Sequence, residues 1–306
     1  MRRMAPPARL RVHQGASSPV CRVEPGPDGL RLTPVAAPEG MTVLETPPIA
    51  LQVAGPYPTQ AMQPTASGRI LVTYGPGMAR TVLVPELAQA FDRRPPGMSD
   101  ALGAAEANAA LLKADDGWRA VVLPSIGDRL SDLGDGPVAI APDGLRIAVA
   151  DGDVVREVGI ADGQRLAEHP GPAEALAYAG DLGLVIARNG RLGDGEPLPA
   201  VRILAGASQA PLALAVHDDG ALRLHGPDGP GEAWTSPVGA PRTVALSADG
   251  GWAAIAGEDA SAVVRAADGA VAARISGATA IALAAGGKIA IGGPWGLALA
   301  GTVEER

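Results

Sequence analysis

The chain has 306 residues, a formal net charge of −8 and hydrophobic residues at 47% of its positions. A nucleic-acid-binding protein needs a dense basic stripe, and the only basic group here is a loose one within residues 2–11, so we expect no nucleic-acid partner. Aromatic residues make up only 3%, so the core has to be built from Val, Ile, Leu and above all Ala. The 41 Gly and 29 Pro fall between apolar runs, as turn residues do.

The sequence also indicates where the protein resides. No apolar stretch reaches the roughly 18 residues of a membrane-spanning helix, and residues 1–12 hold no apolar core of a signal peptide. The single cysteine, Cys21, cannot form an internal disulfide, and a lone thiol is typical of a reducing compartment. We therefore expect a cytoplasmic protein with no membrane partner.

The chain begins with a predicted flexible arm over residues 1–8. Arg9–His13 then alternates apolar and polar residues, as an isolated strand does. Four apolar segments follow with turn residues between them, and they predict a first four-stranded unit. These segments are 19–24, 30–35, 41–45 and 49–54.

A second unit starts around the turn Ser67-Gly68, but its pattern blurs over residues 85–115. This stretch is predicted to be an irregular insertion or a short helix over 99–113, because Ala and Leu are good helix formers. The alternative is a long connection that leads into a strand at 109–113. Residues 125–136, in the third unit, show so weak a strand pattern that this unit is expected to lack one strand.

The pattern is most regular over residues 242–277. Four apolar runs are separated by Asp249-Gly250, Glu258-Asp259 and Asp268-Gly269, which predicts four short antiparallel strands. Shifted by 106 positions, this stretch aligns without a gap with the one that starts at Val138. Such a shift equals three repeats of roughly 35 residues, the length of a four-stranded propeller blade.

Turns interpreted as following the first strand of each unit give the number of units. They lie at Asp28, Ser67, Asp116, Asp143, Gly180, Asp219, Asp249 and Gly286. Eight turns predict eight units, one of them degenerate, or seven if the blurred region makes no unit of its own. The last unit ends in a polar tail, so Arg9–His13 is expected to take its outer place and close the ring, which would remove exposed sheet edges.

Over residues 18–300 the pattern resembles the WD40/YVTN class of β-propeller repeats. The pieces that match best are 138–144 and 244–250, where an apolar strand runs into a Pro-Asp-Gly or an Ala-Asp-Gly turn. The resemblance is one of strand and turn order, since the Gly-His and Trp-Asp signatures are absent. It implies an all-β fold in which residues 1–306 form one β-propeller of seven to eight blades. It also implies a non-enzymatic scaffold, or a subunit of a multi-protein assembly.

In propellers, the loops between the second and third strands of each blade share one face of the disc with the connections between blades. Here the predicted loops carry Asp151, Asp153, Glu258, Asp259 and Trp295. An acidic rim with one exposed aromatic residue would attract a protein with a basic surface. These five residues are therefore the predicted partner-binding site.

The sequence contains no catalytic motif of a nucleophile elbow, a phosphate loop, a dinucleotide fingerprint or a zinc protease, and we predict no cofactor. The alternative function is a hydrolase or small-ligand-binding propeller, similar to lactonases, that uses the central channel. Such sites need inward-facing carboxylates, histidines or aromatic residues. The predicted first strands instead read Ala, Val, Leu and Ile, which leaves the channel chemically bare.

Two features were considered as metal sites. The recurring Asp-Gly pairs are interpreted as turns, and the nearest approach to a calcium loop, Asp151-Gly152-Asp153, has only two acids. His217 and His225 flank a turn and could be cross-strand neighbours, but with Asp218 they offer too few ligands for zinc. No metal is predicted, and His217 is interpreted as a polar-face or hydrogen-bonded residue.

Overall fold

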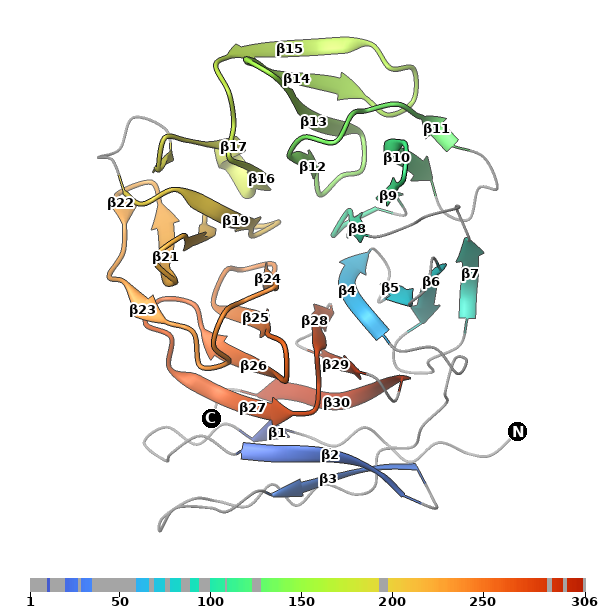
Figure 1. Ribbon diagram of the computed structural model, residues 1–306, viewed down its shortest axis with the longest axis vertical. Coiled ribbons are helices and arrows are strands. Elements are labelled where there is room, and N and C mark those ends of the chain that lie inside the picture. Colours follow the sequence, from blue (N-terminus) through green and yellow to red (C-terminus); the bar gives the residue numbers. More distant parts are fainter. Residues whose placement is uncertain are drawn as a thin grey trace.

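The computed structural model is all-β over the part of the chain that it describes (Figure 1). The described residues are 10–11, 20–26, 29–34, 59–65, 69–74, 78–83, 89–93, 100–107, 109–122, 128–192, 198–284, 288–293 and 296–304. Helix in these ranges amounts to one 3₁₀ turn, η2 (Gly180–Leu182). No helix among them is long and apolar enough to cross a membrane.

The described strands form seven sheets, and three of these sheets have four antiparallel strands in chain order. The first consists of β4 (Thr59–Thr65), β5 (Arg69–Tyr74), β6 (Met78–Leu83) and β7 (Gln89–Arg93). The second consists of β8 (Asp100–Gly103), β9 (Ala109–Ala114), β10 (Gly117–Val122) and β11 (Asp128–Leu130). The third consists of β12 (Val138–Ile140), β13 (Arg146–Asp151), β14 (Val154–Gly159) and β15 (Arg165–Pro170).

The next two sheets are less regular. One has three described strands, β16 (Ala175–Ala179), β17 (Gly183–Arg188) and β18 (Arg191–Leu192). The other runs β19 (Val201–Gly206), β20 (Ala213–His217), β21 (Ala221–Gly226). Its strand β21 then pairs with both β22 (Gly229–Pro230) and β23 (Trp234–Thr235).

The last two sheets combine both ends of the chain. One consists of β24 (Thr243–Leu246), β25 (Trp252–Ala256), β26 (Ala260–Arg265) and β27 (Val271–Ser276), extended by β2 (Val20–Gly26) and β3 (Gly29–Pro34). The other consists of β28 (Ala280–Ala284), β29 (Lys288–Gly293), β30 (Gly296–Glu304) and β1 (Leu10–Arg11). Strand β1 pairs with β30, and β2 with β27, both in parallel.

The first strand of each sheet lies toward a common centre in Figure 1. Successive inner strands contact one another from β4 through β8, β12, β16, β19 and β24 to β28, and β28 contacts β4. Side chains pack between neighbouring sheets. Between β19–β21 and β24–β26, for example, Leu214, Val216 and Leu222 meet Val244 and Ile255 in one buried cluster.

The internal repeat is confirmed at the level of strands. The sheets that begin at Val138 and at Thr243 have the same order of four strands, and two sheets lie between them in the chain. The Asp-Gly turns also form as expected. Oδ1 of five aspartates accepts the backbone N–H two residues further on at 2.9–3.0 Å, and the glycine between has a positive φ. These aspartates are Asp143, Asp162, Asp219, Asp249 and Asp268.

Two sequence predictions about the first 115 residues are wrong. The described residues within 99–113 form no helix, because β8 and β9 pair there as the inner half of a sheet. The alternative prediction of a strand at 109–113 is confirmed as β9. The predicted first unit makes no separate sheet from its described part, since β2 and β3 instead extend the sheet of β24–β27. Segments 41–45 and 49–54 lie outside the described residues. The described strands therefore form seven sheets. The sequence suggested seven units if residues 85–115 made no unit of their own, whereas it is β2 and β3, from the predicted first unit, that form no sheet of their own.

A third prediction, that each of the eight turns follows the first strand of its unit, is wrong at two turns. Asp116 and Asp219 follow the second strand of their sheets rather than the first, since β8 and β19 are the first strands there. The expected N-terminal strand is found as β1, next to β30, although it runs parallel to β30. Residues 301–304, expected to be too polar for a strand, belong to β30. The predicted arm over 1–8 lies outside the described residues.

Candidate partner-binding face

Hydrogen bonds between sheets define one face of the molecule. They join the turns that connect first and second strands: Glu106 N–H donates to Pro142 O at 2.9 Å, Gly180 N–H to Ala207 O at 2.9 Å, and Gln209 N–H to Ala248 O at 2.8 Å. Because consecutive turns of an antiparallel sheet lie at opposite ends of its strands, the turns between second and third strands lie on the opposite face.

This opposite face carries paired acids. Four of its turns each have two exposed carboxylates. The pairs are Asp115 and Asp116 after β9, Asp151 and Asp153 after β13, Asp218 and Asp219 after β20, and Glu258 and Asp259 after β25. We call these eight residues the acidic face.

Four of the five residues predicted for the partner site belong to this set. Asp151, Asp153, Glu258 and Asp259 are all exposed at the predicted turns, whereas Trp295 lies outside the described residues. Asp116 and Asp219 were predicted as turn residues, but as turns after the first strand, which lie on the other face. If β8 and β19 had been predicted as the first strands of their sheets, both turns would have belonged to the predicted site.

Salt bridges neutralise part of the acidic face. Asp151 pairs with Arg156 at 2.8 Å and Glu258 with Arg242 at 3.3 Å, and Arg119 pairs with Asp116. The hydrogen bond from Arg119 lowers the pKa of Asp116. The other five acids make no salt bridge with the residues that the structure describes, so they leave a net negative field in which a cationic partner would be attracted.

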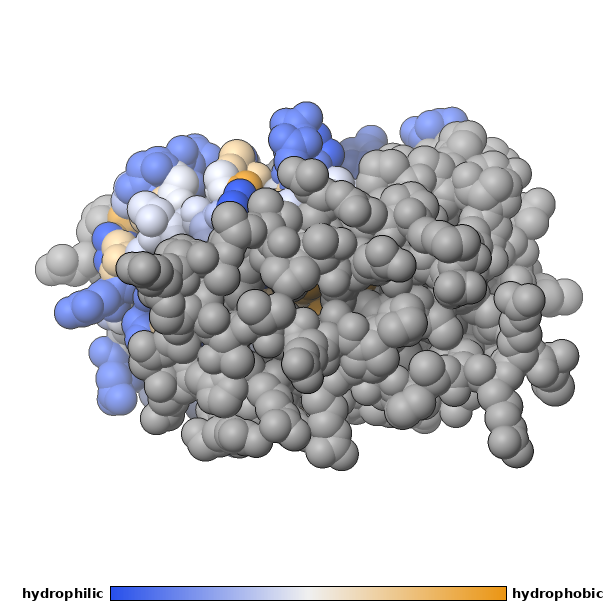
Figure 2. All heavy atoms as spheres, turned by 90° about the horizontal axis from the view of Figure 1, so that it is seen from below, coloured by the Kyte–Doolittle hydropathy of each residue, from blue (hydrophilic) through white to orange (hydrophobic). Residues whose placement is uncertain are grey.

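The described surface elsewhere is also polar. The visible described part in Figure 2 is mostly hydrophilic, with single apolar residues between charged ones. Among the described residues, three large apolar side chains are exposed, those of Leu145, Leu166 and Leu182. On the described surface, charge therefore offers a stronger recognition signal than apolar area.

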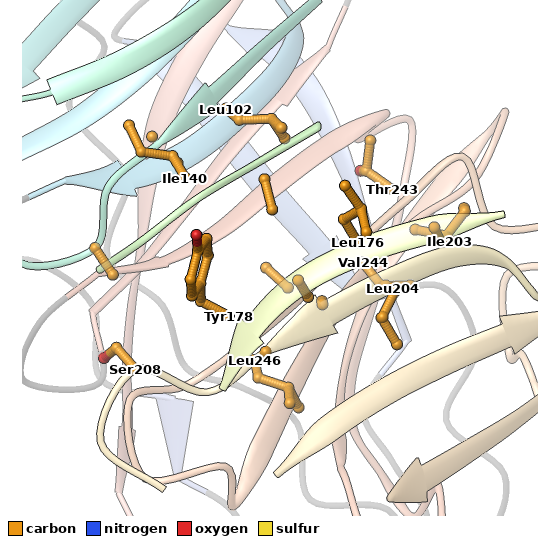
Figure 3. A pocket seen from close by; sticks show the side chains of 18 of the residues that line it. Leu102, Ile140, Leu176, Tyr178, Ile203, Leu204, Ser208, Thr243, Val244 and Leu246 are labelled. Carbon is orange, nitrogen blue, oxygen red and sulfur yellow. The ribbon is translucent and has the colours of Figure 1, made fainter. Parts of the chain in front are cut away.

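A cavity of about 1270 Å³ lies among the inner strands β8, β12, β16, β19 and β24. Its wall combines charged and polar side chains with aliphatic ones, of which Figure 3 shows Leu102, Ile140, Leu176, Ile203 and Val244. Of the polar side chains labelled there, Tyr178 donates its hydroxyl hydrogen to Glu157 at 2.9 Å. The described wall contains no histidine and no cysteine.

Charged side chains line the cavity where the sheets are connected, but most of them are engaged. Glu174 accepts hydrogen bonds from the backbone N–H groups of Gly190 and Val201, and Arg202 donates to the carbonyl of Pro241. Lys113 lies 4.0 Å from Asp135. The hydroxyl of Ser247 donates to Oδ1 of Asp249 at 2.6 Å, and this hydrogen bond lowers the pKa of Asp249. These groups already have partners within the chain.

The histidine pair lies away from this cavity. His217 is fully buried, and its Nδ1 lies 2.7 Å from the carbonyl oxygen of Pro199, which confirms a hydrogen-bonded role. The ring centroids of His217 and His225 are 6.2 Å apart. Burial above all, and then the nearby His217 and Arg223, lower the pKa of His225 to about 4. No group of three metal-ligating side chains occurs among the described residues.

Comparisons with known proteins add no assignment: no protein-family model matches the chain, and no curated protein matches it.

Proposed function

We propose that the chain is a single β-propeller of seven blades that serves as a non-enzymatic interaction scaffold or as a subunit of a larger assembly. Support for the propeller comes from the row of contacts between inner strands, which includes β28 against β4. The pairing of β1 with β30 supports a ring completed by both chain ends. Closed rings leave few sheet edges exposed, which favours a soluble, cytoplasmic protein.

The partner binds through the acidic face and has a basic surface. The observation that carries this proposal is the repetition of two exposed carboxylates in four turns of the same structural position. Turns need at most one aspartate for their own geometry, as at Asp219, whose Oδ1 accepts the N–H of Ala221. The second acid in each turn, such as Asp218 or Asp153, is left for electrostatic recognition, which steers association and selects partners.

A charge-reversal pull-down tests this function. The first variant changes Asp115, Asp153, Asp218 and Asp259 to Lys, since these four acids make no salt bridge with described residues. The matched control changes four exposed acids elsewhere, Glu106, Asp181, Asp228 and Glu232, to Lys. We expect the first variant to lose the proteins that the unmodified chain captures, while the control keeps them. If both variants capture these proteins equally, the acidic face is not the binding site.

The channel function remains a second proposal, because the cavity is large enough for a small molecule. The hydrogen bonds and salt bridges of most charged groups in the wall favour ligand binding over hydrolysis. A substitution of Leu176 by Trp, which adds volume inside the cavity, would abolish ligand binding but leave partner capture unchanged. If Leu176→Trp instead removes partner capture, the partner occupies the channel.

A further inference from the structure

The sheet of β16–β18 is narrower than its neighbours. Its third strand, β18, has two residues, whereas the third and fourth strands of the sheets that begin at β12 and β24 have six residues each. The cause is a short connection. Residues 160–174 separate β14 from β16 and include β15, but only residues 193–200 separate β18 from β19, and 198–200 lie outside strands. This connection is too short for a fourth strand of six residues.

Strand β17 is therefore left with an edge that no described strand covers. On its inner side β17 pairs with β16 from Gly183 to Ala187. On its outer side β18 pairs with Ala187 and Arg188, so residues 183–186 have no neighbouring strand there among the described residues. We call the outer side of residues 183–186 the open edge. A strand edge without a neighbour presents unpaired N–H and C=O groups, onto which another chain can add a strand.

Side-chain burial gives independent support for the open edge. The apolar side chains of Leu184, Val185 and Ile186 are half-buried. The three central residues of the other second strands β9, β13, β20 and β25 are each at most 8% exposed. Since β17 occupies the same position in its sheet as these strands, the difference arises from the missing outer cover. Apolar area at an unpaired backbone edge favours an apolar, extended ligand.

The two ends of the open edge have opposite charges. At one end, Arg188 is directly opposite Arg191, and such a like-charge pair is unfavourable. Arg188 donates to the carbonyls of Pro172 and His169, whereas Arg191 is exposed and makes no salt bridge with a described residue. At the other end, the exposed Asp181 precedes β17 and likewise makes no salt bridge with a described residue. A ligand with an acid at one end and a base at the other would complement both.

We propose that the open edge binds an extended segment of a partner protein, which adds a strand antiparallel to β17. Both existing neighbours of β17 are antiparallel to it, so the added strand would begin beside β18 and end beside Gly183. The segment carries an acidic residue at its amino end next to Arg191, alternating apolar residues in the middle, and a basic residue at its carboxyl end next to Asp181. Backbone hydrogen bonds supply affinity in such strand addition, and the side chains supply specificity.

The flanking sheets favour a single segment over a folded second copy of the chain. Their outer strands β15 and β22 lie further from the common centre than β17 (Figure 1). The sheet edge of a second copy would meet these strands before it reached β17, whereas one extended segment needs the width of one strand. This site is separate from the acidic face and does not depend on it.

Selection of peptides against the full chain tests the proposal. The probe is a library of random ten-residue peptides displayed on phage. We expect enrichment of peptides with alternating apolar residues between an amino-terminal acid and a carboxyl-terminal base. Hydrogen–deuterium exchange with the best synthetic peptide should then slow within residues 183–188. If no peptide is enriched, or if the bound peptide protects only other parts of the chain, the proposal is overturned.

Variants locate the site. Val185→Lys should bind the selected peptide at least about tenfold more weakly, because a lysine at a strand edge opposes strand addition. Arg191→Glu changes an exposed residue, and selection repeated on it should enrich a base instead of an acid at the amino end of the peptide. Arg265→Glu, which makes the same charge change on the exposed end of β26, is the matched control and should keep the original preference.

Two results with these variants would also overturn the proposal. One is equal affinity of Val185→Lys and the unmodified chain for the peptide. The other is an unchanged preference of Arg191→Glu, a test that does not depend on a change within β17. The variant with Asp115, Asp153, Asp218 and Asp259 changed to Lys should bind the peptide as the unmodified chain does, so failure of the acidic face and failure of the open edge can be told apart.

Discussion

Glu157 links two neighbouring sheets through its buried carboxylate. It lies on β14, and its Oε2 accepts a hydrogen bond from the hydroxyl of Tyr178 on β16 at 2.9 Å. Its Oε1 lies 2.9 Å from Nε2 of His169, and Arg146 Nη1 is 3.9 Å from Oε2. Burial first, and then the bond to Glu157, raise the pKa of Tyr178 far above its usual value, so the phenol keeps its proton and remains a donor.

Replacement of Tyr178 by Phe should lower the free energy of unfolding by about 1–3 kcal/mol, because the buried carboxylate of Glu157 loses a partner. Urea denaturation measures the change. The matched control, Asp181→Asn, alters an exposed side chain and should stay within about 0.5 kcal/mol of the unmodified chain. A Tyr178→Phe variant as stable as the control would show that the bond contributes nothing.

His225 makes stability depend on pH. Its pKa is about 4 in the folded chain, below the usual histidine value of 6.5, so the unfolded chain binds the proton more tightly. Stability should therefore be complete above pH 6.5 and fall as the pH drops toward about 4, by roughly 3 kcal/mol in total from this group. Urea titrations in gluconate buffer at several pH values measure this slope. His225→Gln should flatten it, and an unchanged slope would mean that other groups cause the loss.

At the scale of elements, the sequence predicted best where each strand is bounded by its own turns. In the sheets that begin at β12 and β24, an Asp-Gly turn precedes the second strand and another precedes the fourth, so all four strands could be placed. Strand β8 was missed because Ala101 and Leu102 and the Ala-rich residues after them have high helix propensity, and the pairing of β8 with β9 decides its state. Pairing with β27 likewise decides the place of β2, and no local pattern encodes such a contact.

The failure to predict first strands also explains why the predicted partner site was incomplete. Missing β8 and β19 shifted the turns at Asp116 and Asp219 to the wrong face, although both had been recognised as turns. The histidine pair had a weaker signal. His225 is in register with Ala213 and His217 with Val201, but the sequence could not reveal that their Nε2 atoms have no partner among the described residues.

Close approach of two inner strands depends on a glycine. A Cβ at Gly206 on β19 would overlap the backbone carbonyl of Tyr178 on β16. Gly206→Ala should therefore push the two strands apart and destabilise the protein by about 1–3 kcal/mol, as overpacking does. Gly251→Ala is the matched control, since its Cβ would meet only ordinary contacts of 3.5 Å and more. Urea midpoints that fall equally for both variants would contradict the close packing of β16 and β19.

At the scale of the whole molecule, the two faces have different roles in this account. Backbone hydrogen bonds join the turns between first and second strands across neighbouring sheets, as between Gln209 and Ala248. The opposite turns carry the acid pairs, which are exposed. In the proposed propeller, charges from distant parts of the sequence would lie on one surface, which no single turn could provide.

The affinity of the captured partner, measured by calorimetry at increasing salt concentrations, tests this division of roles most directly. Binding to the unmodified chain should weaken as salt screens the acidic face. The Asp115, Asp153, Asp218 and Asp259 to Lys variant should bind at least about tenfold more weakly, while the Glu106, Asp181, Asp228 and Glu232 variant should match the unmodified chain. Equal affinity of all three proteins, independent of salt, would contradict this division of roles.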